Sequence, residues 1–310
     1  MKKKFNNSAG ITLIEMLIGV VITALMMGAM FTTYNVVNNS YSQVSDRAKI
    51  SRSGRDILAM LMRDIRLAGF KYHLGDNDKG VSPSDDLTHN AGVDDILKSH
   101  DPIIIIQNKL GYTPVDRIVP DDETNVYKQH NTEHDLCCDR IHIVYGDFAW
   151  DGEELDGDDQ AYKRYKVTYY AMPSSRKEDK YYSVYKTKES WIETENNPDG
   201  AWTSKCSLCY HEQLVREHLV DMEFIAYGKN GKIFDPPPIP NAFNSVDLYN
   251  IRVVDVKLTF RSKDKFYKYK PKKDKVILAI SGNNERMGAF DDKYLRDSVV
   301  VSVHTRNIKG

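Results

Sequence analysis

An almost wholly apolar run from Ile11 to Phe31 limits what this chain can become, because it contains a single carboxylate, Glu15. A helix over this run would be about 31 Å long at about 1.5 Å per residue, close to the hydrocarbon thickness of a bilayer. A carboxylate inside such a segment costs about 2.5 to 3.5 kcal/mol on insertion scales. We therefore predict that Glu15 has a function and that this function requires an interacting partner.

Local charge predicts how the segment is oriented. The 310-residue chain has a net charge of −1, so its overall charge indicates no attraction to nucleic acid or anionic lipid. Lys2, Lys3 and Lys4 precede the apolar run, and the next basic residue is Arg47. The positive-inside rule places the N-terminus in the cytoplasm and everything after about Tyr34 across the membrane.

The small residues Ser8, Ala9 and Gly10 precede the apolar run, which inverts the order of an ordinary secretory signal peptide. Cleavage after them would remove a polar leader, residues 1–10, and leave the membrane segment on the mature protein. A plain signal-anchor without cleavage is the alternative on charge pattern alone.

Helical periodicity continues past the membrane edge. Apolar residues recur at helical spacing from Val44 to Ala68, and no proline occurs before Pro83. We predict one helix from about Thr12 to Leu67, ended by Gly69. Residues 11–34 form its transmembrane half and residues 35–70 its amphipathic half.

Residues 71–310 contain short β-branched and aromatic runs separated by long polar loops, several of them strictly alternating, which predicts an antiparallel sheet with one covered face. The fold class is therefore α+β, with a long N-terminal helix packed on a β-rich head. The predicted strands are 102–107, 140–145, 165–172, 181–186, 220–227, 251–260, 275–280 and 298–306. The predicted loops are 73–100, 121–136, 147–162, 188–210 and 229–249, and their length indicates a surface elaborated for contact.

The lysine-rich leader, the small residues ending in Gly10 and the sequence "TLIE" opening a long apolar helix resemble the class III signal of type IV pilins and type II secretion pseudopilins. The resemblance implies the type IV pilin fold, cleavage by a prepilin peptidase between Gly10 and Ile11, and N-methylation of Ile11. The usual first mature residue is phenylalanine, so Ile11 departs from the commonest pattern.

Three further segments, 54–70, 214–228 and 300–307, are similar to the W-type (PilW-like) minor pilins. Minor pseudopilins of the J type share the helix but usually have a smaller head. The resemblance implies a minor pilin in a priming or tip complex, with other minor pilins, the major pilin, the prepilin peptidase and an inner-membrane assembly platform as partners. It implies an inner-membrane precursor with a periplasmic head, and later a place in the pilus at the cell surface.

The family also supplies a partner for Glu15, the N-terminal ammonium that the same cleavage creates on a neighbouring subunit. Pairing in low dielectric favours insertion of one subunit beside another and penalises a wrong axial register. A snorkelling or protonated Glu15 without a partner is the alternative. Thr12 is either a second assembly contact or an ordinary threonine in the helix interior.

The four cysteines, Cys137, Cys138, Cys206 and Cys209, are disulfide candidates if the head is translocated. Neighbouring cysteines seldom bond to each other, so we expect cross-links between the 137–138 and 206–209 loops, with a Cys206–Cys209 bond as the next possibility. Zinc is a further alternative, with His130, His134 and His211 as additional ligands.

Two charged segments allow more specific functional interpretations, which we consider secondary. Asp151, Glu153, Asp156 and Asp158 are candidate Ca²⁺ ligands, but their order does not fit an EF-hand, and a solvated acidic loop is favoured. Seven lysines interleaved with aromatic residues over 263–275 could bind DNA, but a charged hairpin loop is favoured.

Nothing in the sequence favours an enzyme or a cofactor. It contains no GxSxG, P-loop or GxGxxG motif. The segment beginning at His211 resembles the start of a zinc-protease helix, but Val215 stands where the second histidine would be. An adhesive or ligand-binding module on a pilin stem is the alternative to an assembly role.

Overall fold

A computed structural model describes residues 12–70, 100–107, 112–114, 127–129, 138–148, 162–173, 181–194, 197–234, 237–238, 248–267, 275–280, 288–290 and 292–308. The chain divides into two units, Met1–Lys49 and Ile50–Gly310. The first element is the helix α1 (Leu13–Leu67), which begins one residue later than predicted.

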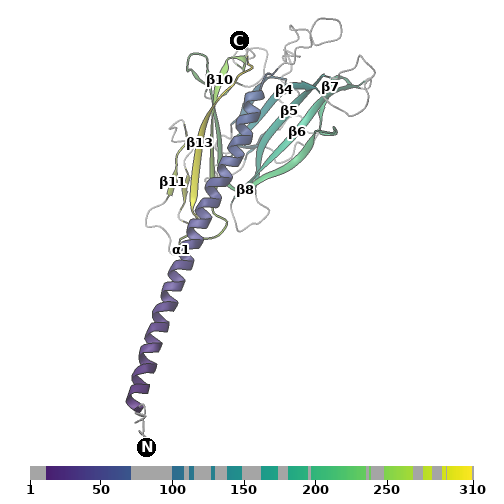
Figure 1. Cartoon of the computed structure of the whole chain (residues 1–310). Helices are drawn as coiled ribbons and strands as arrows, with labels where there is room; N and C mark the ends of the chain where they lie inside the picture. The colour runs from purple at the N-terminus through teal and green to yellow at the C-terminus, as the bar shows by residue number, and fades with distance from the viewer. Residues whose placement is uncertain are drawn as a thin grey trace, which may run out of the picture. The chain divides into compact units, whose positions relative to one another are not determined.

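Strands make up most of the second unit (Figure 1). Those of the main sheet and its flanks are β1 (Ile103–Ile106), β4 (Arg140–Phe148), β5 (Tyr162–Pro173), β6 (Tyr182–Thr194), β7 (Asn197–Thr203), β8 (Tyr210–Gly228), β9 (Ile233–Phe234), β10 (Ile251–Arg261) and β13 (Arg296–His304). Two short antiparallel pairs form separate sheets, β2 (Tyr112–Pro114) with β3 (Tyr127–Gln129) and β11 (Lys275–Ile277) with β12 (Gly288–Phe290).

The main sheet holds nine of the described strands and is antiparallel throughout. Its order is β1-β4-β5-β6-β8-β10-β13, with β7 added beside β6 and β9 beside β8. All eight predicted runs are strands, although several boundaries differ. The predicted loop at 188–210 is wrong, because β6 continues to Thr194 and pairs with β7, where Trp191 lies opposite Trp202.

The part of α1 from Ile50 onward packs on one face of this sheet and forms its main core. On the helix, Leu61 and Ile65 are completely buried, as are Phe224 and Val256 on the sheet. Gly54 permits the close approach, because a Cβ there would lie 3.1 Å from the Val299 side chain. The amphipathic pattern predicted for this part of α1 therefore corresponds to a real buried stripe.

Gly69 ends the helix, as predicted. Its φ of +69° lies in the left-handed region, where glycine avoids the strain of a side chain. Its N–H donates to the Val144 carbonyl at 2.9 Å, and the N–H of Gly146 donates to the Phe70 carbonyl at 2.9 Å. The chain leaving α1 is thus fixed to β4 by backbone hydrogen bonds.

The expectation of only one covered face is wrong at the centre of the sheet. Along β10, Val254, Val256 and Leu258 face the core that contains α1, and the alternating residues Lys257 and Thr259 should face solvent. Both are nevertheless buried, with Lys257 5% and Thr259 0% exposed. The backbone after β11 covers this second face, since the Leu278 carbonyl accepts a hydrogen bond from the Lys257 Nζ.

Candidate functional site

The first part of α1 exposes its apolar side chains on all sides. From Leu13 to Val44 the large apolar side chains are between 48% and 81% exposed. The helix is long and apolar enough to cross a membrane, judged by its length and composition. Since an apolar surface of this extent is unfavourable in water, this part of α1 requires lipid or other apolar helices around it.

Threonine hydroxyls within this segment are satisfied by the helix itself. The Thr23 hydroxyl donates to the Gly19 carbonyl at 2.5 Å, and those of Thr32 and Thr33 donate to the Ala29 carbonyl at 2.8 and 2.9 Å. Such bonds to the preceding turn remove the cost of a hydroxyl in an apolar medium. They leave Glu15 as the charged side chain of the segment.

Glu15 and Thr12 form a capping box at the start of α1. One Glu15 carboxylate oxygen accepts hydrogen bonds from the Thr12 N–H and the Thr12 hydroxyl, both at 2.8 Å. In return, the Glu15 N–H points to the Thr12 hydroxyl oxygen at 3.4 Å. Thr12 is therefore the N-cap residue and not a residue of the helix interior.

The capping box has a sequence signal that the prediction missed. Threonine followed three residues later by glutamate, immediately before an apolar run, is the usual pattern of such a box. These hydrogen bonds reach one Glu15 oxygen, and the part of the chain that the structure describes supplies no cation to this carboxylate. Gly10 and Ile11, the predicted cleavage and methylation site, lie outside the described residues.

A buried carboxylate fixes the other end of α1 to the sheet. Asp64 is 3% exposed, and its Oδ2 lies 2.7 Å from the Lys186 Nζ of β6. The same oxygen accepts a hydrogen bond from the Tyr169 hydroxyl of β5 at 2.6 Å. Burial, followed by the charge of Asp64, raises the pKa of Tyr169 far above its ordinary value, so this hydroxyl stays a donor. Asp64 therefore has its partners inside the chain.

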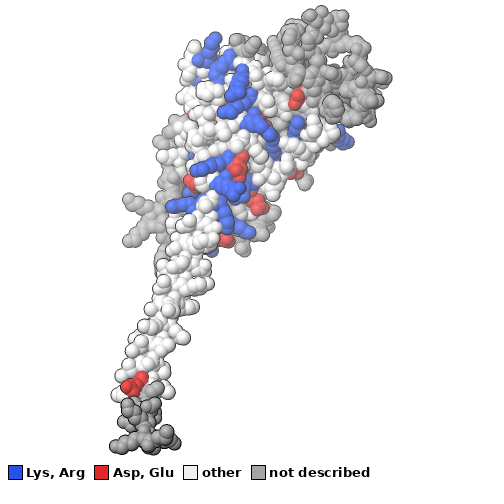
Figure 2. All heavy atoms as spheres, viewed as in Figure 1, with Lys and Arg blue, Asp and Glu red and all other residues white. Residues whose placement is uncertain are grey.

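A basic groove of about 410 Å³ lies along the last turns of α1 and the C-terminal segment. Its apolar lining comes from Met62, Leu67 and Phe70, and it is edged by Arg63, Arg66 and Arg306. Figure 2 shows Lys and Arg side chains gathered over this part of α1. The surface is suited to contact with acidic or uncharged groups.

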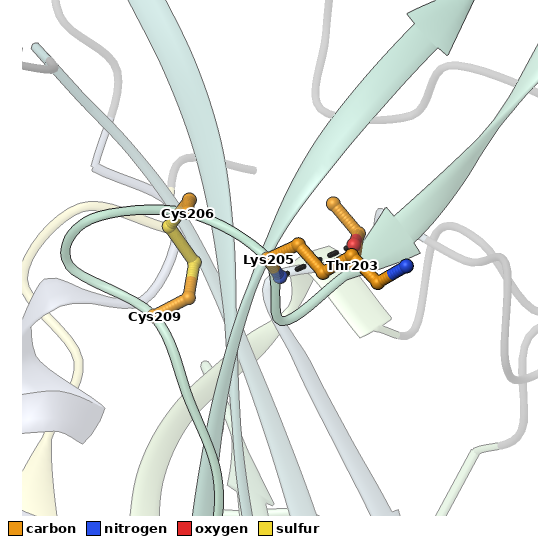
Figure 3. Close-up of a disulfide and its surroundings, with 4 residues drawn as sticks. All are labelled: Thr203, Lys205, Cys206 and Cys209. Atoms are coloured by element: carbon orange, nitrogen blue, oxygen red, sulfur yellow. Dashed lines mark hydrogen bonds between the residues drawn. A yellow bond between two sulfur atoms is a disulfide. The ribbon is translucent and has the colours of Figure 1, made fainter.

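The expected cross-links between the 137–138 and 206–209 loops are wrong, and the second possibility, a Cys206–Cys209 bond, is confirmed. Cys206 bonds to Cys209 across the turn between β7 and β8 (Figure 3). The Cys209 N–H donates to the Cys206 carbonyl at 3.1 Å, which closes the turn and brings the two sulfurs together. Cys138 is also disulfide-bonded, whereas Cys137 lies outside the described residues. Because Cys206 and Cys209 are paired with each other, they cannot cross-link the 137–138 loop.

The alternative metal and nucleic-acid sites gain no support from the described residues. Those residues contain no group of three or more His, Cys, Asp or Glu placed to hold a metal ion. The candidate calcium ligands Asp151, Glu153, Asp156 and Asp158 lie outside them, as do His130 and His134. In the lysine-rich segment, Phe266 and Tyr267 pack against the core, with ring centroids 4.9 Å apart, and not as an open stacking surface for bases.

Comparison with known proteins identifies the N-terminal signal. Residues 5–31 match the family described as the prokaryotic N-terminal methylation motif. None of the curated proteins matches the chain. Among solved structures, a type IV-like pilin from Thermus thermophilus is similar at 9% identity and a TM-score of 0.39, over 83% of this chain and 96% of that chain.

The methylation motif extends into the apolar part of α1, and an antiparallel sheet follows later in the chain. The chain therefore carries a prokaryotic N-terminal methylation motif at the start of a long apolar helix. The motif and the apolar helix together are consistent with a membrane-anchored segment.

Proposed function

We propose that this protein is a minor pilin that assembles through α1 into a type IV pilus, in a priming or tip complex with other minor pilins. The observation that carries the proposal is the exposed apolar segment from Leu13 to Val44 with its single carboxylate. Resemblance of segments 54–70, 214–228 and 300–307 to W-type minor pilins favours this role over that of a J-type pseudopilin. The role is structural and requires no catalytic residue.

In this proposal, assembly compensates the charge of Glu15. A prepilin peptidase cleaves between Gly10 and Ile11, and the new N-terminus of Ile11 is methylated. The resulting ammonium of a neighbouring subunit then pairs with Glu15, whose hydrogen bonds to Thr12 satisfy the carboxylate but do not neutralise it. An axial shift between subunits would leave both charges unpaired in an apolar medium, so the pair selects one register.

The protein would begin in the inner membrane with its N-terminus in the cytoplasm and its head in the periplasm. The assembly platform and the major pilin would then receive it, and the head would reach the cell surface with the pilus.

Processing can be tested by the mass of the purified mature protein. We expect a chain that lacks Met1–Gly10 and carries one methyl group on Ile11. An intact leader would contradict the processing step on which the proposed pairing depends.

Assembly can be tested with Glu15→Leu, which removes the charge from the apolar segment. We expect the variant to be inserted in the membrane but lost from sheared pili, and unchanged incorporation would overturn the proposed role of Glu15. Deletion of the gene separates the two function classes. Loss of all pili supports priming, whereas normal pili with lost attachment supports an adhesive module.

A further inference from the structure

Lys257 of β10 lies between two carboxylates of β8, on the sheet face turned away from α1. Its Nζ is 3.4 Å from the Asp221 Oδ2 and 3.5 Å from the Glu223 Oε2. The side chains of Lys257, Asp221 and Glu223 are 6%, 1% and 5% exposed. One ammonium thus faces two carboxylates in a site from which water is largely excluded.

The sheet register holds these three groups in place. Lys257 lies directly opposite Glu223, and Thr259 lies opposite Asp221, in the antiparallel pairing of β10 with β8. Lys257 therefore reaches Glu223 across the strands and Asp221 on the diagonal, both within range of a long side chain. Because central strands carry the groups, their spacing is fixed by backbone hydrogen bonds.

The segment after β11 covers these three groups on the side away from the sheet. The Lys257 Nζ donates to the Leu278 carbonyl, and the Ile280 N–H donates to both Glu223 oxygens at 3.1 and 3.0 Å. Ile277 packs with Val220 as a buried apolar pair beside the cluster. Glu223 is thereby held in place, and the Asp221 Oδ2 lies 3.4 Å from the Lys257 Nζ.

A buried cluster of this kind is costly as ions, because the removal of each charge from water is repaid only by excellent pairing. Condensation of the amine with one carboxylate would remove two of the three charges. Joining the ions as an amide is unfavourable in bulk water, but aligned groups reach effective concentrations of about 10⁵ to 10⁸ M. Exclusion of water from the site also opposes the reverse hydrolysis.

We propose that Lys257 and Asp221 form an intramolecular amide bond. Glu223 takes a proton from the Lys257 ammonium, the Nζ attacks the Asp221 Cγ, and a bond forms between nitrogen and carbon. One carboxylate oxygen then leaves as water with protons delivered through Glu223, which returns to its starting state. The ammonium and carboxylate thus become an amide and one water, without oxidant, reductant or other reactant. The product is a covalent link between β8 and β10.

Tryptic digestion of the purified full chain tests this proposal at the residues concerned. We expect the segments 217–229 and 253–261 to appear as one linked species, lighter than their sum by the mass of one water, with no cleavage after Lys257. Leader cleavage and N-methylation do not alter these peptides. Separate peptides with cleavage after Lys257 would overturn the proposal.

Two variants test the roles within the cluster. Asp221→Ala removes the attacked carbon, and the nearly isosteric Glu223→Gln removes the proton carrier, so both should yield separate peptides. A fully linked species in Glu223→Gln would overturn the role given to Glu223. The wild-type digest decides whether the bond exists even if a variant fails to fold.

The Asp64–Lys186 pair provides a matched control within the same digest. Its two charged atoms are closer, at 2.7 Å, but its third buried member is the Tyr169 hydroxyl and not a second carboxylate. We expect no linked peptide from this pair. A link there would show that proximity alone suffices and would overturn the requirement for a second carboxylate.

Discussion

The first part of α1 and the head differ in where their apolar side chains find contacts. From Leu13 to Val44 the large apolar side chains are at least 48% exposed, whereas the head buries a continuous core that includes Leu61 and Phe224. The head can therefore fold on its own interactions, and the apolar part of α1 depends on lipid or other subunits. Assembly and stability should be separable by mutation.

The two carboxylates near the ends of α1 show the same contrast. Asp64 is buried and paired with a cation of its own chain, Lys186. Glu15 is exposed and is hydrogen-bonded only locally, to Thr12, in the part of the chain that the structure describes. A carboxylate with an internal cation serves the fold, and one without a counter-charge in an apolar segment is available to a partner.

Glu15→Gln should have the largest effect, namely loss of incorporation into pili. Glutamine at this position can keep the capping box, because its side-chain oxygen still accepts from the Thr12 N–H, but it carries no charge. Incorporation is measured by immunoblotting of sheared pili against the membrane fraction. We expect the unfolding temperature of the head to stay unchanged.

A matched control for this variant is Asp46→Asn, which makes the same chemical change on α1 outside the apolar run. Asp46 pairs with Lys49 at 3.6 Å on the helix surface, a contact of little energetic value. Incorporation of the Asp46→Asn variant into pili should resemble that of the unmodified protein. If Glu15→Gln assembles equally well, capping and not charge is the role of Glu15.

Asp64→Ala should destabilise the head by about 3–5 kcal/mol, because it leaves the Lys186 ammonium buried without its partner. The Tyr169 hydroxyl also loses its acceptor. Urea unfolding of the full chain in mild detergent measures the change in the free energy of unfolding. Asp56→Ala, at an exposed position of the same helix, should change it by about 0.5 kcal/mol or less.

A small effect of Asp64→Ala would mean that the buried pair adds little to the fold. The contrast between the two carboxylates would then rest on Glu15 alone.

Local patterns predicted the helix, its end at Gly69 and the main strands, because each depends on periodicity or on a single backbone conformation. β7 could not be predicted from its sequence "NPDGAWT", which contains turn-forming Pro, Asp and Gly. It forms a strand because it pairs with β6, where the Trp191 and Trp202 rings are 5.1 Å apart. Tertiary contacts override local preference there.

The candidate site divides in the same way. The prepilin signal and Glu15 lie within one short segment and could be recognised directly. The partners of Asp64 and Lys257 lie far along the chain, and only the fold brings them together. The disulfide expectation failed for a related reason, since a tight turn at 206–209 is a property of the folded loop and not of the cysteine spacing alone.

Cys206→Ser should lower the stability of the head by about 2 kcal/mol or less, because the disulfide closes a loop of sequence separation 3 and short loops constrain the unfolded chain little. Thermal unfolding under non-reducing conditions measures the effect. Leu208→Ala, at an exposed position of the same turn, should have almost none. Pilus incorporation at low temperature should be normal for both variants. Loss of incorporation in Cys206→Ser would show that the turn takes part in assembly.

The last prediction concerns pH and the histidines of the head. His142 is 1% exposed, and its Nδ1 lies 2.8 Å from the Thr168 hydroxyl. Burial, and then the charges of Lys166 and Arg140, lower the pKa of His142 well below its ordinary value. The folded state therefore stays unprotonated while the unfolded state takes up a proton below about pH 6.5.

Because the unfolded state binds more protons in that window, stability is fully present above about pH 6.5 and falls below it, by at most about 1.4 kcal/mol per pH unit for one histidine. His218, whose pKa is also lowered by burial, adds in the same direction. Urea unfolding between pH 7 and pH 5 should show a shallower slope for His142→Gln, and the exposed control His304→Gln should keep the original slope. Since no histidine precedes His73, the histidine contribution to the slope comes from the head. An unchanged slope in His142→Gln would contradict the assignment of part of that contribution to His142.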